Sequence, residues 1–104
     1  VQEDSPSDNQ PLLEIGRQRI HAEMRSIAAM MDTIDDHFLA AVYLLASCQG
    51  KVLVSGVGAS AAVARRMAHF LAVTGTPALY FDASEAIHGS LGAVESGDVL
   101  VAIS

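Results

Sequence analysis

A glycine-rich turn between two apolar segments is the part of the sequence best suited to bind an anion. The turn Gly56-Val57-Gly58-Ala59-Ser60 follows the short apolar run Val52–Val54 and precedes the alanine-rich segment Ala59–Val73. Glycines let the backbone turn tightly, and the N–H groups and dipole at the start of a helix favour a negative charge. Ser60 adds a hydroxyl donor, so the turn predicts a phosphate site.

Three interpretations of this turn compete. The residues match the G-x-G-x-x-A variant of the dinucleotide fingerprint, and Asp82 ends the next apolar run, where a ribose-binding acid would lie. A sugar phosphate held by Ser60 and the turn amides fits equally well. A plain tight turn with Ser60 as the helix cap is the alternative without a ligand.

A second polar segment, Ser84–Gly92, follows the next apolar run. In open α/β sheets ligands bind at the carboxyl ends of the strands, which is where this segment lies. Glu85 and His88, three residues apart, suit proton transfer and hydroxyl recognition, and Ser84 lies beside them. Glu85 and His88 are therefore candidate catalytic residues. The alternatives are a structural, hydrogen-bonding role for His88 and a local cap or ion pair for Glu85.

The elements that position these residues alternate between strand and helix patterns. Apolar residues at steps of three and four predict two N-terminal helices, broken at the capping cluster 32–36, with Gln49-Gly50 ending the second. Strands at Val52–Val54, 78–81 and Val99–Ile103, with a helix at Ala59–Val73 and a short turn at Ser84–His88, predict a parallel α/β sheet covered on both faces. The helical stripe runs through Ile20, Met24, Ile27, Met31, Ile34, Phe38, Ala41 and Leu45.

Composition narrows the class of protein. A formal charge of −6 argues against a nucleic-acid partner, and no apolar run reaches the length of a membrane span. The single cysteine, Cys48, cannot form an internal disulfide, and the acidic start does not resemble a signal peptide. We expect a cytoplasmic protein without a metal or another cofactor.

Longer segments of the sequence resemble sugar isomerase (SIS) domains. The resemblance covers about Ile20 to Ser104, and its motifs lie at Gly50–Ser60, Thr74-Gly75-Thr76-Pro77, Ala83–Gly92 and Asp98–Ser104. The segment Glu85-Ala86-Ile87-His88-Gly89-Ser90-Leu91-Gly92 is its most specific part, and it is most similar to the arabinose-5-phosphate isomerase branch.

This resemblance implies a flavodoxin-like, three-layer α/β/α fold with a five-stranded parallel sheet, of which this chain supplies about three strands. It implies a phosphate site built from Gly56–Ser60 and from a second turn starting at Ser104, and we expect Ser84 and His88 to line the sugar side. It also implies isomerisation between aldose and ketose through an enediol, with a glutamate base beyond position 104.

One residue departs from the family pattern. Arabinose-5-phosphate isomerases carry a lysine between the second glycine and the serine, where this sequence has Ala59. The second interpretation is therefore a non-catalytic phosphosugar sensor, and the third is a dinucleotide-binding domain. We expect a tail over residues 1–11, a helical segment over 12–49, the first half of the SIS domain over 50–104, and a homo-oligomer, a dimer or a tetramer. The helical stripe has two interpretations, packing in a core or an interface between subunits.

Overall fold

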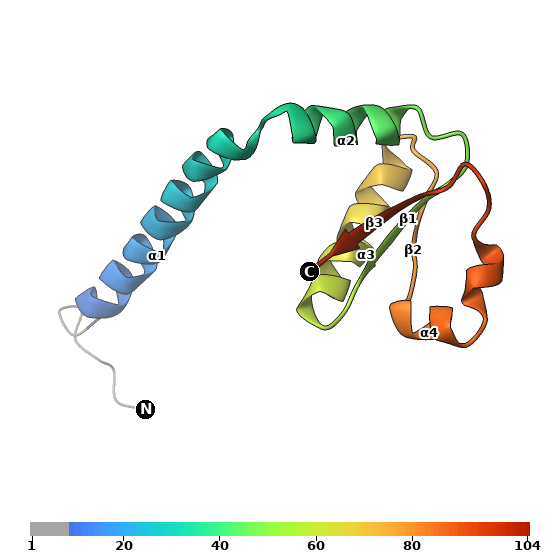
Figure 1. The fold of residues 1–104 in the computed structure, drawn as a ribbon. Coiled ribbons are helices and arrows are strands. Elements are labelled where there is room, and N and C mark those ends of the chain that lie inside the picture. The colour runs from blue at the N-terminus through green and yellow to red at the C-terminus, as the bar shows by residue number, and fades with distance from the viewer. Residues whose placement is uncertain (1–8) are drawn as a thin grey trace. The chain divides into compact units, whose positions relative to one another are not determined.

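The computed structural model describes residues 9–104, which form two compact units that are considered separately. The first unit runs to Leu39 and the second from Ala40 to Ser104. The elements follow one another in the order drawn in Figure 1: α1 (Gln10–Ala29), a 3-10 turn (Met30–Thr33), α2 (Asp36–Ala46), β1 (Val52–Gly56), α3 (Ala59–Val73), β2 (Ala78–Tyr80), α4 (Ala83–Ile87), a second 3-10 turn (Ser90–Ala93) and β3 (Val99–Ile103).

The N-terminal helical pattern is broken where the sequence predicts. Asp35 precedes α2, and its carboxylate accepts the N–H groups of His37 and Phe38 at 3.0 and 3.1 Å. These bonds satisfy donors that the first turn of a helix leaves free. Helix α2 ends at Ala46, before the expected Gln49-Gly50. Of the expected tail, residues 1–8 lie outside the described part of the chain, and α1 already begins at Gln10.

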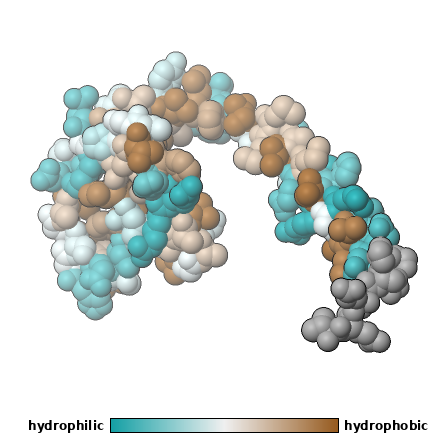
Figure 2. Space-filling view, turned by 180° about the vertical axis from the view of Figure 1, so that it is seen from behind, coloured by the Kyte–Doolittle hydropathy of each residue, from teal (hydrophilic) through white to brown (hydrophobic). Residues whose placement is uncertain are grey.

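Helix α1 buries none of its side chains within the described chain. Its large apolar residues are exposed, as with Ile20 at 65% and Ile27 at 64%. Figure 2 shows hydrophobic side chains beside hydrophilic ones along this helix. No helix among residues 9–104 is both long and apolar enough to cross a membrane.

The sheet of the second unit is parallel, with the strand order β2-β1-β3. In the register, Val52 lies opposite both Ala78 and Val99, and Val54 lies opposite Tyr80 and Val101. Strand β1 lies between the other two strands and is accordingly the most continuously buried of the three, with its first four residues buried. The predicted α/β class with a parallel sheet is confirmed, and β1 extends two residues further than expected, through Ser55 and Gly56.

Helix α3 packs on one face of this sheet through small residues. Val52 and Val54 are fully buried and form the core with Ala64 and Ala68 of the helix. Because these alanines lie four residues apart, they share one face of the helix and let its backbone approach the sheet. On the other face, the neighbours of Leu53 in the register, Leu79 and Leu100, are exposed.

Asp98 joins the start of β3 to the start of β1. Its carboxylate accepts the Lys51 N–H at 2.9 Å, the Lys51 ammonium at 2.7 Å and the Glu95 N–H at 2.7 Å. The Asp98 side chain is only 3% exposed. The Lys51 ammonium and the two backbone donors lower the pKa of Asp98 to about 2, so the carboxylate stays ionised well below neutral pH.

We predict that Asp98→Asn lowers the melting temperature of the chain by roughly 5 to 10 °C at pH 7. The amide removes the charge that pairs with Lys51 and replaces one acceptor oxygen with a donor. A matched control is Glu14→Gln, because the exposed pair of Glu14 with Arg17, 3.9 Å apart, should contribute little.

The same pair of variants predicts a pH dependence. A carboxylate whose pKa is lowered by folding stabilises the native state above its unfolded pKa, and this contribution is lost as the pH falls toward its folded pKa. The stability difference between the wild type and Asp98→Asn should therefore shrink between about pH 4 and pH 2. A difference that stays constant over that range would contradict the assignment.

Candidate functional site

A hollow of about 420 Å³ opens at the carboxyl ends of β1 and β3. The chain leaves β1 toward β2 on one side and returns to β3 on the other, so this is the point where the strand order reverses. Open α/β sheets bind ligands at such points. The residues that line the hollow are Ser55, Gly56, Val57, Ser60, Ala83, Ala102, Ile103 and Ser104.

The glycine turn brings the start of α3 against the end of β1. A Cβ on Gly56 would lie 2.7 Å from the backbone carbon and oxygen of Ser60, a distance that only glycine permits. Gly58 has φ +63° and ψ −128°, a conformation that favours glycine. The N–H groups of the first turn of α3 are thereby placed at the edge of the hollow, where the helix dipole favours an anion.

Ser60 does not act as the helix cap. The N-cap position belongs to Gly58, no side chain caps the helix, and Ser60 lies within the first turn. The hydroxyl of Ser60 has no hydrogen-bond partner among the interactions found in residues 9–104, so it remains available to a ligand. This observation argues against the interpretation of the segment as a plain capped turn.

Charge distinguishes this hollow from a smaller neighbour. No side chain that lines the first hollow carries a charge. The second hollow, of about 200 Å³ between the glycine turn and the end of β2, contains Asp82. The Ser84 hydroxyl, followed by backbone N–H groups, lowers the pKa of Asp82, which keeps its carboxylate ionised. A phosphate would be repelled there, so the first hollow is the better anion site.

The role of Asp82 also weakens the dinucleotide interpretation. Its Oδ1 accepts the Ser84 N–H at 2.8 Å, the Ser84 hydroxyl at 2.7 Å and the Glu85 N–H at 3.4 Å. These contacts make Asp82 the cap of α4. The oxygen that a ribose-binding acid would offer is therefore already used, although the second oxygen remains.

The predicted site residues divide into three groups. Gly56, Ser60 and Ser104 line the first hollow, while Gly58 and Ser84 line the second, which Gly56 also borders. The other three predicted residues line neither hollow, so their roles stay predictions: Ala59 at the start of α3, Glu85 in the first turn of α4, and His88, which ends α4 and is exposed.

Sequence reasoning missed Ser55. It is a buried residue of β1, 7% exposed, and it lines the first hollow. A signal was present, because Ser55 directly precedes the glycine turn and is the first polar residue after the apolar run Val52–Val54, at the end of the strand where α/β sheets bind ligands. No group of three His, Cys, Asp or Glu residues in the described part of the chain could hold a metal ion.

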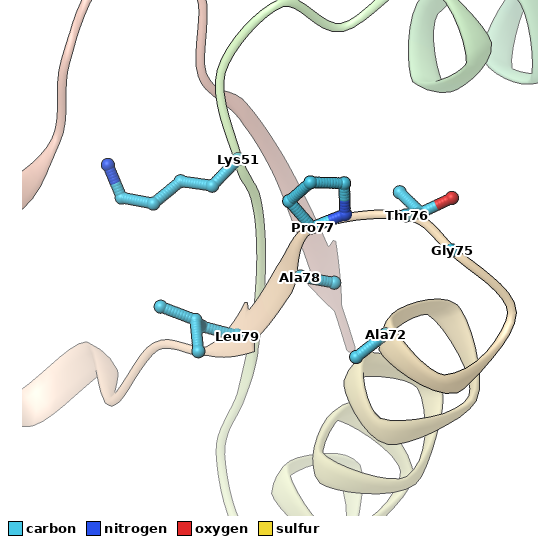
Figure 3. A pocket seen from close by; sticks show the side chains of 7 residues that line it. All are labelled: Lys51, Ala72, Gly75, Thr76, Pro77, Ala78 and Leu79. Atoms are coloured by element: carbon cyan, nitrogen blue, oxygen red, sulfur yellow. The ribbon is translucent and has the colours of Figure 1, made fainter.

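A larger hollow, of about 500 Å³, lies at the opposite ends of β1 and β2. Figure 3 shows its mainly small and apolar lining, with the Lys51 side chain extending away from Ala72 and Thr76. The Lys51 ammonium is paired with Asp98. The cation in this lining is therefore already engaged and most of the other lining residues are apolar, so the greater volume does not make this hollow the better anion site.

Comparison with known proteins adds an independent line of argument. The sequence profile of the SIS domain matches residues 44–104. Arabinose 5-phosphate isomerase GutQ of Escherichia coli K12 is 40% identical over 96 residues, which are 92% of this chain and 30% of that protein. Arabinose 5-phosphate isomerase KdsD of Shigella flexneri is 38% identical over 91 residues, 88% of this chain and 28% of that protein.

A solved structure gives the same result. A protein of E. coli CFT073, determined in complex with arabinose 5-phosphate, superposes with a TM-score of 0.84 at 38% identity. The match covers 92% of this chain and 51% of that one. The chain thus spans about 30% of the length of the curated relatives and about half of the solved one.

We predict that Gly56→Ala lowers the free energy of unfolding by about 1 to 3 kcal/mol, because the added methyl group collides with backbone atoms. It should also abolish anion binding, since the start of α3 must move. Gly92→Ala is the control, because a Cβ there would have no heavy atom within 4 Å. Chemical denaturation of both variants checks this, and equal stability would refute the close-contact argument.

Proposed function

The chain belongs to the SIS domain family, and on that premise we propose that it binds a sugar phosphate in the hollow between β1 and β3. The observation that carries this proposal is the uncharged hollow at the start of α3, with unused serine hydroxyls in its walls. Ser60 and the first-turn amides of α3 bind the phosphate. Ser104, at the end of β3, contributes from the opposite wall.

We further propose that the whole protein is an aldose–ketose isomerase of the arabinose-5-phosphate type. A base removes a proton from the carbon next to the aldehyde, and the resulting enediol is reprotonated at the former aldehyde carbon. The names of the relatives support this substrate class. In this proposal, His88 and Glu85 act on the sugar side with Ser84, and the glutamate base lies beyond Ser104.

Ala59 favours a second candidate, a phosphosugar sensor without turnover. A lysine at this position would place a cation beside the substrate, whereas alanine leaves the amide and hydroxyl contacts intact and removes the charge. Binding and catalysis are thus separable at this turn. A dinucleotide remains the third candidate, and the use of Asp82 as a helix cap argues against it.

We propose that the protein acts in the cytoplasm as a homo-oligomer, a dimer or a tetramer. The exposed apolar side chains of α1 support self-association, because apolar side chains left in water favour a partner surface.

The proposed ligand is tested by NMR titration of the chain with arabinose 5-phosphate and, separately, with NAD. We expect the sugar phosphate to bind, and Ser60→Ala to weaken its affinity about tenfold or more, as for the loss of a hydrogen bond to a charged group. Ser96→Ala, an exposed serine outside both hollows, should leave the affinity unchanged. Binding of NAD alone would reverse the ranking of the candidates.

Self-association is tested by light scattering on the double variant Met24→Glu, Ile27→Glu. Two carboxylates on the exposed stripe of α1 should shift the mass toward that of a monomer. Ser26→Glu is the control, because Ser26 lies on the opposite side of the helix. A wild-type mass equal to one chain would rule out the oligomer.

A further inference from the structure

Ser55 and Ser60 approach the hollow from opposite faces of the sheet. Side chains alternate between the faces along a strand, and Val54 packs against α3. Gly56 also faces α3, since its missing Cβ would meet Ser60. Ser55, between them, therefore faces the other side, next to Ala102 in the register of β3.

The hydroxyl of Ser55 is buried and unpaired. The residue is 7% exposed, and its Oγ has no hydrogen-bond partner in the described structure. A buried polar group without a partner is unfavourable, and such groups in native proteins are rare. Along β1 the three preceding residues are apolar, so an alanine or valine would have filled this position without that cost.

The missing partner can come from the hollow. Ser55 is one of the residues that line this space, together with Ser60 and Ser104. Its Oγ is itself shielded from solvent, so a rotation about the Cα–Cβ bond must turn the hydroxyl into the hollow to meet a ligand. A ligand hydroxyl both donates and accepts a hydrogen bond, as the serine hydroxyl does, so the two groups match. A phosphate is favoured at the other wall, because the N–H groups at the start of α3 can donate hydrogen bonds to it.

We infer that the Ser55 hydroxyl binds a hydroxyl of the sugar, and that Ser60 on the opposite wall binds the phosphate. This inference rests on the proposed sugar-phosphate binding. It makes Ser55 a residue that distinguishes a sugar phosphate from phosphate alone, while Ser60 contributes to the binding of both.

The experiment compares Ser55→Ala with the wild type in NMR titrations with arabinose 5-phosphate and with inorganic phosphate. We expect the variant to bind the sugar phosphate about 3- to 10-fold more weakly, as for one neutral hydrogen bond. Its affinity for inorganic phosphate should be unchanged. Ser60→Ala should weaken both ligands, and Ser47→Ala, whose hydroxyl donates to the Tyr43 carbonyl, should weaken neither.

A second measurement separates a binding role from a structural one. Since Ser55→Ala removes an unpaired buried hydroxyl, the melting temperature without ligand should stay the same or rise. A marked fall would mean that the hydroxyl stabilises the fold, which would overturn the inference.

The titrations also separate this inference from the proposal beneath it. If the wild type binds the sugar phosphate and Ser55→Ala binds it equally well, only the role of Ser55 is refuted. If Ser55→Ala weakens the binding of both ligands equally, the hydroxyl does not bind the sugar part of the ligand, which again overturns the inference. If the wild type binds neither ligand, the proposed function fails and the inference fails with it.

Discussion

The ion pair and hydrogen bonds of Asp98 fix the relative position of the two strands between which the hollow opens. The Asp98 carboxylate accepts hydrogen bonds from the Lys51 ammonium, from the backbone N–H of Lys51 and from the backbone N–H of Glu95. The contact is tight enough that a Cβ on Gly50 would collide with the carboxylate. Because β1 and β3 start together, their parallel register places Gly56 opposite Ile103 at the other end.

The other side of the site depends on small residues. Ala64 and Ala68 let α3 lie close to Val52 and Val54, and Gly56 lets the first turn of the helix lie close to the end of β1. A larger side chain at any of these positions would lift the helix from the sheet. The first-turn N–H groups would then move away from the hollow, so the proposed binding of an anion would depend on packing in the core.

Much of the fold follows from local patterns that the sequence displays. Helix α3 has the predicted bounds, Ala59–Val73, and so does β3, Val99–Ile103, because a glycine turn and an apolar run delimit them. The break before α2 was predictable because Asp35 caps it through its own side chain. Periodicity alone does not say which strands lie side by side, so the order β2-β1-β3 was known only from the structure.

The site was less predictable than the fold. Gly56 and Ser60 lie in one turn, so sequence spacing sufficed to group them. Ser55 was hidden because its importance comes from burial without a partner, which depends on strands far apart in the sequence. Asp82 could be read as a ribose ligand until its contacts with Ser84 and Glu85 were known. Contacts between side chains decide such cases, and a single sequence does not contain them.

The residues that line the first hollow have no charged side chains, and this should determine how the affinity for a phosphate depends on pH and on ionic strength. A phosphate monoester bound there as proposed would be stabilised by oriented dipoles, which do not titrate. The pH dependence of affinity then reflects the ligand itself, whose second ionisation has a pKa near 6. Dipoles at short range are also less sensitive to screening by salt than a lysine at the protein surface, so this turn would keep its preference across changes in ionic strength.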